Sequence, residues 1–220
     1  SGRVTGVQTC ALPILSIVKL ILENHFKPGD FLLETTLSKV LSLSRTPVRH
    51  ALGQLVAEGF LDKKKKKGCF IPAASPDDAR HVFFARENIE GLTATSAARC
   101  ATDKDVDFLW SLIKEEQSID RDLSKIDYVN INGAFHMGIA KIGKNKYLEQ
   151  YCRHSFWRSH AYILFFDNYY TGNIAAGIQK TGPQQHIQIV KAIENRNDEK
   201  AGNLMRQHVR TTYDLLSLKL

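Results

Sequence analysis

The sequence predicts a mostly α-helical protein with two parts: an N-terminal winged helix-turn-helix with a small β-hairpin, and a C-terminal all-α helical bundle. Three observations support this prediction. Apolar residues recur at helical spacing along most of the 220 residues. Two short apolar segments flank a run of five lysines, as in a β-hairpin. After residue 76 no strand-like alternation appears, and long helical patterns follow one another.

The first two helices are predicted to precede a tight connection. Residues 17–24 carry apolar side chains at helical spacing and end before the turn signal Lys27-Pro28-Gly29-Asp30. Residues 34–41 predict a short second helix whose apolar side chains face inward, namely Leu37, Val40 and Leu41. Residues 41–44 then form the connection to a third helix.

The third helix is predicted to expose two arginines near its N-terminal end. Ser44 suits the N-cap, and Pro47 suits the first turn, because the N–H that proline lacks has no helical partner there. Four apolar residues face the core at helical spacing: Val48, Leu52, Leu55 and Val56. Arg45 and Arg49 lie four positions apart on the outer face, as a recognition helix in a DNA major groove requires.

A basic hairpin is predicted to follow the third helix. Gly59 suits the C-terminal cap of that helix, and residues 60–62 and 69–71 predict two short strands around a lysine-rich wing. Residues 1–75 contain eleven Lys and Arg against five Asp and Glu, whereas residues 76–220 contain nineteen against eighteen. The positive charge is therefore concentrated in the part that is predicted to contact phosphates.

Several motifs occur in a fixed order over about residues 16–72. They are Pro28-Gly29-Asp30, Glu34-x-x-Leu37, Ser44-Arg45-Thr46-Pro47-Val48-Arg49-x-Ala51-Leu52-x-x-Leu55, Glu58-Gly59 and the wing glycine Gly68. This set resembles the DNA-binding domain of the GntR family of bacterial transcription regulators. The resemblance implies contacts to double-stranded operator DNA from Ser44, Arg45, Thr46, Arg49, Lys65, Lys66 and Gly68. A solvated helix face, and lysines that add only non-specific attraction, are the alternatives.

The domain boundaries follow from changes in composition. Residues 1–14 contain no initiator methionine, no helical periodicity and no charged leader, so we interpret them as a non-native segment similar to a translated sequencing adapter. The DNA-binding domain is then expected over residues 15–75. Pro76 and the acidic pair after it mark a helix start, so an all-α effector-binding and dimerisation domain is expected over residues 76–220.

The second domain is predicted to be a bundle of six or seven helices. The helical stretches are residues 77–100, 103–120, 124–142, 145–168, 183–195 and 198–217. Residues 169–182 contain three glycines and precede Pro183, so they predict a loop.

Three of these helices carry side chains that are able to bind a cation. Asn132 and His136 share one helical face, His186 lies near the start of the next-to-last helix, and His208 lies on the last one. Imidazole suits zinc, nickel, copper, iron or manganese, and such a site keeps positions open for water or a ligand. An ordinary core or surface position for each histidine is the alternative.

A second ordered set of motifs covers about residues 77–217. It consists of Arg86-x-x-x-Glu90, Asn132-x-x-x-His136, Gly143-Lys144-Asn145-x-x-Leu148, His186-x-x-Ile189-x-x-Ala192-Ile193 and Asp198-x-x-x-Ala201-x-x-x-Met205-x-x-His208. This set resembles the FCD effector domain of the FadR subfamily of GntR regulators, with a lean toward the shorter VanR-like arrangement.

The resemblance implies a divalent metal held by Asn132, His136, His186 and His208, either zinc or nickel, with manganese or iron as alternatives. Metal-binding members of the family hold an aspartate where this chain has Asn132, and a neutral amide supplies no charge to offset the cation. The resemblance also implies a small carboxylate effector beside the metal, with Arg86, Arg153 and Arg158 as its cationic contacts. A polar cavity that holds water or an anion is the alternative.

Together these features predict a bacterial, cytoplasmic homodimer that represses transcription and responds to a small organic acid. Four scattered cysteines suit a reducing compartment, and no apolar run is long enough to cross a membrane. An enzyme is disfavoured, because no HExxH motif occurs and an enzyme has no use for a winged domain. The second alternative is a DNA-binding dimer whose C-terminal domain is purely structural and metal-free.

Overall fold

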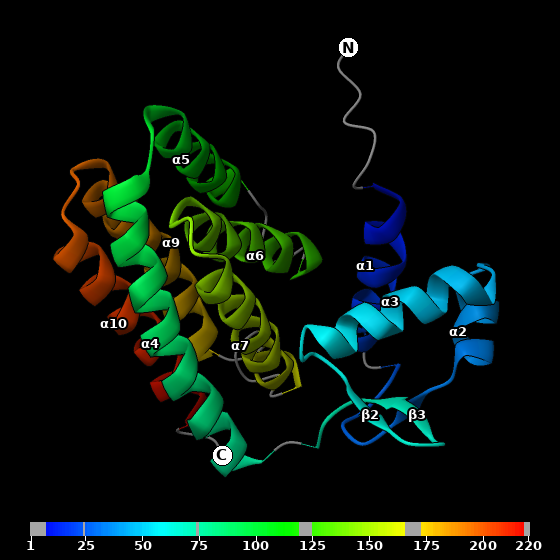
Figure 1. The fold of residues 1–220 in the computed structure, drawn as a ribbon. Helices are drawn as coiled ribbons and strands as arrows, with labels where there is room; N and C mark the ends of the chain where they lie inside the picture. Colours follow the sequence, from blue (N-terminus) through cyan, green and yellow to red (C-terminus); the bar gives the residue numbers. More distant parts are fainter. Residues whose placement is uncertain (1–7, 24, 74, 119–124, 166–172, 218–220) are drawn as a thin grey trace. The chain divides into compact units, whose positions relative to one another are not determined.

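The computed structural model describes residues 8–23, 25–73, 75–118, 125–165 and 173–217. The chain divides into two compact units, Ser1–Ala74 and Ser75–Leu220 (Figure 1). The hairpin of the first unit and the helical bundle of the second were predicted, and the fold class is confirmed. None of the described helices combines the length and the apolar character that crossing a bilayer requires.

The first unit is built from three helices, α1 (Gln8–Leu22), α2 (Glu34–Val40) and α3 (Arg45–Ala57). Helix α3 packs on both others, and the shared core consists of Ile17, Val18, Ile21, Leu37, Val48, Leu52 and Leu55. Ser42 adopts a φ of 53° in the tight turn between α2 and α3. Gly59, at φ 81°, follows the C-cap of α3 as expected, since glycine tolerates this left-handed conformation.

The sheet of the first unit has three strands in the order β1-β3-β2, and both pairings are antiparallel. The predicted hairpin is present as β2 (Asp62–Lys64) and β3 (Gly68–Phe70), slightly displaced from the expected ranges. Strand β1 (Phe31–Leu32) was not predicted, because two residues are too few for a periodicity to appear. It pairs with β3 through Phe31 opposite Phe70.

Two expectations for the first unit are wrong. Helix α1 begins at Gln8, whereas the sequence was interpreted as having no helical period before residue 15. The buried side chain of Ile14 extends the apolar stripe of Ile17 and Val18 by one turn toward the N-terminus. Residues 1–7 of the predicted non-native segment lie outside the described residues. Val40, expected to face inward, is 57% exposed, because it is the last residue of α2 and lies past the core contact of Leu37.

The second unit is a bundle of α4 (Pro76–Cys100), α5 (Asp103–Ser118), α6 (Lys125–Ile142), α7 (Lys146–Phe165), α9 (Asn173–Glu194) and α10 (Asp198–Ser217). Ser75 caps α4 by accepting a hydrogen bond from the Asp78 N–H at 3.3 Å. Helices α4 and α10 pack most closely, since Gly91 and Gly202 face each other across the pair. A Cβ on Gly202 would collide with Thr95 Oγ1 and lie 3.1 Å from the Gly91 carbonyl oxygen.

The predicted loop over residues 169–182 is wrong over its second part. Helix α9 already contains residues 173–182 and continues through Pro183. The prediction gave weight to three glycines and to a helix start at the proline, whereas residues such as Ala175 and Ala176 favour helix. Residues 169–172 lie outside the described residues.

Candidate functional site

The first candidate site is the outer face of α3. Ser44 occupies the N-cap as predicted, although its side chain makes no capping hydrogen bond. Arg45 and Arg49 project from the first two turns, and each side chain is 61% exposed. Thr46, between them, is also exposed. The exposed arginines leave their guanidinium groups accessible to a polyanion.

Glu34, at the start of α2, holds both arginines. Arg49 donates from Nε and from Nη2 to the two carboxylate oxygens, each at 2.9 Å, and Arg45 Nη2 donates at 3.3 Å. These hydrogen bonds, that from Arg49 foremost, lower the pKa of Glu34. The sequence analysis noticed Glu34 only as part of a motif, because nothing in the local pattern connects it to residues eleven and fifteen positions away.

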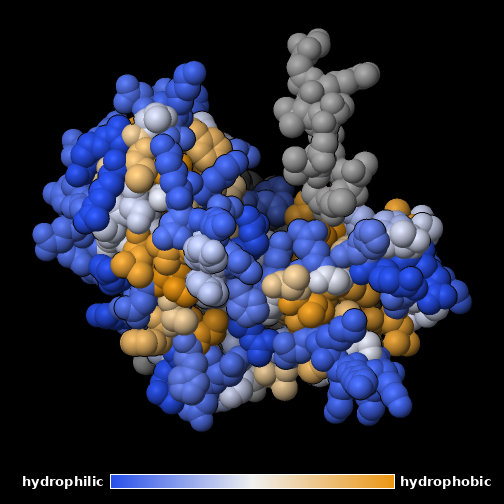
Figure 2. Space-filling view, in the orientation of Figure 1, coloured by the Kyte–Doolittle hydropathy of each residue, from blue (hydrophilic) through white to orange (hydrophobic). Residues whose placement is uncertain are grey.

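A groove of about 670 Å³ separates α3 from the wing. Its lining includes five cationic side chains: Arg45, Arg49, Lys63, Lys66 and Lys67. Gly68 lines it too, at a φ of 104° that lets the wing turn back into β3. Lys65 is exposed in the wing turn. Figure 2 shows this end of the unit as a hydrophilic protrusion at the lower right. The groove thus concentrates positive charge between two protruding elements, as binding to a phosphate backbone requires.

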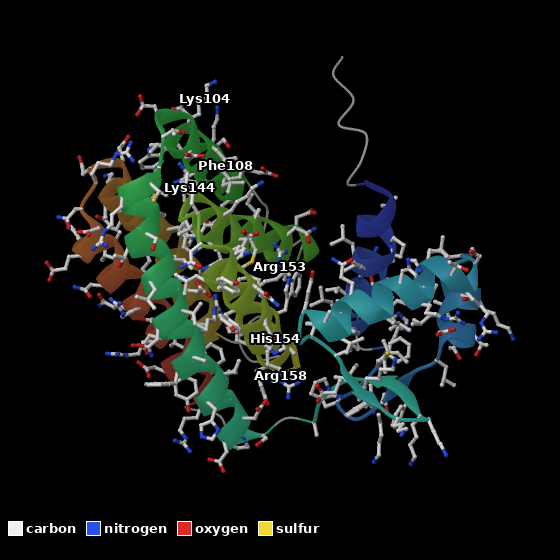
Figure 3. All side chains as sticks on the ribbon, viewed as in Figure 1. Lys104, Phe108, Lys144, Arg153, His154 and Arg158 are labelled. Carbon is white, nitrogen blue, oxygen red and sulfur yellow. The ribbon has the colours of Figure 1, made fainter. Side chains whose placement is uncertain are left out.

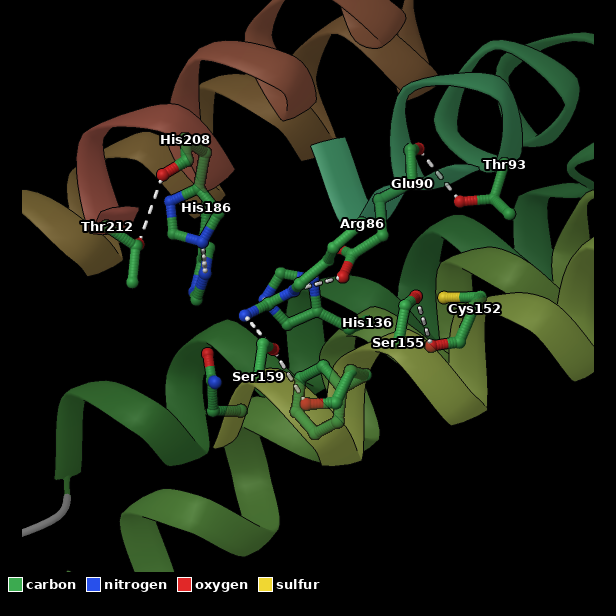
Figure 4. A network of polar contacts seen from close by, with 12 residues as sticks. Arg86, Glu90, Thr93, His136, Cys152, Ser155, Ser159, His186, His208 and Thr212 are labelled. Atoms are coloured by element: carbon green, nitrogen blue, oxygen red, sulfur yellow. Dashed lines mark hydrogen bonds and ion pairs between the residues drawn. The ribbon is translucent and has the colours of Figure 1, made fainter. Parts of the chain in front are cut away.

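The second candidate site is a buried histidine cluster inside the second unit (Figure 4). His136 comes from α6, His186 from α9 and His208 from α10, and all three are at most 7% exposed. One ring nitrogen of each lies within 4.8 Å of the others. Asn132, one turn before His136 on α6, is 8% exposed. The structure therefore brings the three predicted histidines to one point.

Each of these histidines has an oxygen acceptor behind it. His186 Nδ1 lies 3.0 Å and 3.1 Å from the two carboxylate oxygens of Glu116 on α5. His208 Nδ1 lies 2.8 Å from Gln185 Oε1, and His136 Nδ1 contacts Glu90 Oε2 on α4. Because carboxylate and amide oxygens accept hydrogen bonds, the neutral form of each ring carries its hydrogen on Nδ1 and its lone pair on Nε2. Such partners fix the tautomer and orientation of metal-ligating histidines.

The donor set fits a cation. His186 Nε2 and His208 Nε2 lie 3.2 Å apart. In the tautomers with the hydrogen on Nδ1, both Nε2 atoms carry lone pairs, and the two lone pairs face each other. Two lone pairs at this distance repel each other unless a positive charge lies between them. Zinc–nitrogen bonds of about 2.0–2.1 Å would separate two tetrahedral ligand nitrogens by about 3.4 Å. The observed spacing is thus close to that of two ligands on one ion.

The charge states support the same interpretation. Burial lowers the pKa of His136 to about 4 and that of His208 well below its usual value, so both rings are neutral near pH 7. Burial alone would raise the pKa of Glu90, but Arg86 and His136 outweigh it and lower that pKa to about 2. A neutral imidazole with an ionised carboxylate behind it, as His136 has in Glu90, is a strong ligand for a divalent cation.

Arg86 connects this cluster to α4 and α7. Its side chain is 2% exposed, and Nε donates to Glu90 Oε1 at 2.5 Å. Nη1 donates to Ser159 Oγ at 3.1 Å, while Nη2 lies 3.4 Å from His136 Nε2 (Figure 4). The guanidinium also lies over the ring of Phe156, 4.8 Å from its centroid. A fixed cation beside the histidines is suited to binding a carboxylate.

The other two predicted effector contacts lie on α7 (Figure 3). Arg153 pairs with Glu149 at 3.5 Å, and its side chain is 41% exposed. Arg158 donates from Nε and Nη2 to Asp78 Oδ2 at 3.1 Å and 2.9 Å, and is 18% exposed. The structure therefore groups Arg86 with the histidines and places Arg153 and Arg158 against other carboxylates.

Four residues of this site were not recognised as such from the sequence: Glu90, Glu116, Gln185 and His160. His160, on α7, is buried and its Nε2 lies 3.2 Å from Asn132 Nδ2. Burial, then the charge of Arg86, lowers the pKa of His160 well below its usual value. One signal was available for Glu116, since it falls on the buried stripe of α5 with Leu109 and Leu112, where an unpaired charge is costly.

Both units match known protein families. Residues 15–71 match the model described as "Bacterial regulatory proteins, gntR family", and residues 81–211 match that of the FCD domain. The chain is 24% identical over 190 residues to the Nta operon transcriptional regulator of Aminobacter aminovorans, covering 86% of each chain. It is 26% identical over 200 residues to the HTH-type transcriptional repressor GlaR of Escherichia coli K12, covering 89% of this chain and 90% of GlaR.

A solved structure shares the fold. The E. coli protein McbR/YncC superimposes with a TM-score of 0.77 at 17% identity, covering 97% of this chain and 99% of its own.

Proposed function

Because the chain belongs to the GntR family of bacterial regulators, in the group that carries an FCD domain, we propose that it is a transcriptional repressor controlled by a small carboxylate bound beside a divalent metal. The protein is a DNA-binding transcription regulator and not an enzyme. The repressor role, the metal, the carboxylate and the homodimer are the parts that we propose. The observation that carries the proposal is the convergence of three buried histidines, each with one ring nitrogen within 4.8 Å of those of the other two.

The operator contacts follow from the surface of α3 and the wing. We assign base-edge contacts to Arg45 and Arg49, since arginine pairs bidentately with guanine in the major groove. Ser44 and Thr46 adjoin them, and Lys65, Lys66 and Gly68 of the wing supply phosphate or minor-groove contacts. A homodimer would place two such surfaces on successive half-sites of a near-palindromic operator.

His136, His186 and His208 would hold the metal, with Asn132 Oδ1 as the oxygen ligand. When bound, a zinc or nickel ion, or alternatively manganese or iron, supplies positive charge and open coordination positions for carboxylate oxygens. Glu90, Glu116 and Gln185 keep the three imidazoles in the ligating tautomer. Arg86 is the contact that we assign to the effector carboxylate, and Arg153 and Arg158 would act further from the metal.

The response to the effector is a coupling between two sites. Arg86 and Glu90 lie on α4, the helix that begins at Pro76 directly after the DNA-binding unit in the chain. A carboxylate that displaces Arg86 from His136 changes contacts on that helix. Coupling is reciprocal, so operator DNA must weaken carboxylate binding by the same factor by which the carboxylate weakens DNA binding.

The alternative is a regulator whose helical domain is metal-free and serves only for dimerisation. One observation favours it: Arg86 Nη2 lies 3.4 Å from His136 Nε2 and so contacts the lone pair that a metal needs. In that case the buried polar network is purely structural.

Metal content distinguishes the two functions. We expect elemental mass spectrometry on untagged protein to find about one divalent metal per subunit, and none in the His136→Ala/His208→Ala double variant. Small carboxylates should then release the wild-type protein from operator DNA in a fluorescence anisotropy assay, and should not release the double variant. Absence of metal in the wild type, even after reloading with zinc or nickel, would leave the structural alternative.

A further inference from the structure

Asn132 and His160 form a buried pair, and the function proposed above gives His160 no role. Asn132 is on α6 and His160 on α7, with exposures of 8% and 2%. The amide nitrogen of Asn132 lies 3.2 Å from His160 Nε2. A buried amide so close to a ring nitrogen has a defined orientation, and the ring decides which orientation it is.

The other ring nitrogen of His160 determines the direction of this hydrogen bond. His160 Nδ1 lies 3.2 Å from the Phe156 carbonyl oxygen, which only accepts hydrogen bonds. Nδ1 therefore carries the hydrogen, and Nε2 of the neutral ring carries a lone pair. Only the NH₂ end of the Asn132 amide can donate to that lone pair. The carbonyl oxygen Oδ1 is consequently the end of the amide that His160 does not engage.

Two aromatic side chains of α7 pack against the His160 ring. The ring stacks on Phe156 at 4.0 Å between centroids and 27° between planes. Trp157 lies edge-on to it, with 6.3 Å between centroids. Helix α7 thus supplies both the acceptor that sets the tautomer and the aromatic contacts of the ring.

We infer that His160 is a positioning residue for the metal site, which orients Asn132 so that its oxygen, and not its NH₂ group, is available to the cation. The inference rests on the proposed function, since it needs a metal. Asn132 and His136 lie four residues apart on α6, so both side chains lie on the same face of the helix. An amide without His160 can present either end, and its NH₂ end repels a cation.

The pairing also accounts for the amide at position 132. An aspartate there has no hydrogen to donate to His160 Nε2, so its carboxylate would face a lone pair across 3.2 Å. His160 would then have to give up its bond to the Phe156 carbonyl. Asn132 and His160 are therefore matched, and the oxygen ligand of this site is neutral.

A double-mutant cycle with Co²⁺ tests the inference. Metal-free protein is titrated with Co²⁺, whose visible absorption reports the number of ligands, for wild type, Asn132→Ala, His160→Phe and both together. We expect His160→Phe to weaken Co²⁺ binding about 10- to 100-fold in the wild-type background. It should have no further effect once Asn132 is alanine, and His160→Gln, whose Oε1 accepts a hydrogen bond, should recover much of the affinity.

Equal losses in both backgrounds, or no loss in either, would overturn the inference while leaving Co²⁺ binding by the wild type, and hence the proposed function, intact. No Co²⁺ binding by the wild type would overturn both. A measurement on the unmodified protein does not depend on whether the variants fold: ¹⁵N NMR of the metal-free protein should find the His160 hydrogen on Nδ1. A hydrogen on Nε2 would overturn the inference.

Discussion

Replacing Glu90 with glutamine is expected to destabilise the metal-free protein much more than replacing Glu116, although each change removes a buried carboxylate. Glu90 is 1% exposed and accepts from Arg86 Nε at 2.5 Å while also contacting His136 Nδ1. A glutamine has one carbonyl oxygen for these two donors, so its NH₂ group would face one of them. Arg86, itself 2% exposed, would lose its counter-ion.

The magnitude follows from the burial of that pair. Removing one partner of a buried ion pair costs about 3–5 kcal/mol, because the other charge stays buried and uncompensated. Glu116 is the matched control, since it is 2% exposed and both its oxygens contact the single nitrogen His186 Nδ1. Glu116→Gln keeps one acceptor for one donor and should cost about 1–3 kcal/mol.

The assay is urea unfolding followed by circular dichroism in the presence of a chelator, which removes any contribution from metal binding. Each variant should unfold at a lower urea concentration, and the shift of its midpoint equals the loss in free energy of unfolding divided by the slope m. The shift should be larger for Glu90→Gln than for Glu116→Gln. A cost for Glu90→Gln that does not exceed the cost for Glu116→Gln would refute the argument that Arg86 depends on Glu90 for its charge balance.

Three further predictions follow from other parts of the structure. Metal-free protein should lose about 3 kcal/mol of stability as the pH falls from 6.5 to about 4, because burial lowers the pKa of His136 to about 4 and the unfolded chain is protonated there first. Chemical unfolding at several pH values measures this loss, and the same dependence of stability on pH in His136→Gln would contradict the assignment to His136. Glu34→Gln should reduce the difference in binding free energy between operator and non-specific DNA by about 1–3 kcal/mol, because Arg49 loses its bidentate partner while the surface gains net positive charge. Fluorescence anisotropy with operator and random duplexes tests this, and an unchanged difference would show that Glu34 does not orient the arginines. Gly202→Ala should destabilise the protein by about 1–3 kcal/mol, because the added Cβ collides with Thr95. Gly53→Ala, on the exposed face of α3 with nothing within 4 Å, should stabilise it by about 0.5–1 kcal/mol. Thermal unfolding of both variants is the check, and an unchanged stability of Gly202→Ala would mean that α4 and α10 move apart at little cost in free energy.

Periodicity and turn residues sufficed to predict both units and most helices, since these signals are local. Local signals failed at β1, whose two residues exist as a strand only through pairing with β3. They failed again at the start of α9, where a proline inside a helix was mistaken for its beginning.

The histidines of the cluster were found because their residue type limits their chemistry. Their hydrogen-bond partners were not found, because the partners come from other helices. Glu116 and His186 are 70 positions apart, and Asn132 and His160 are 28 apart. A sequence gives no measure of such distances until the helices have been packed.

The charges around the histidine cluster have a consequence for how a signal is received. The charges of Glu90 and Arg86 offset each other, and burial keeps the rings of His136 and His208 neutral, so these four side chains provide no net positive charge. A carboxylate alone therefore meets no net attraction there. A bound divalent cation would add two positive charges, of which one monocarboxylate offsets one. On the proposed function, the protein is therefore a coincidence detector, which registers the organic acid only in cells that also supply the metal.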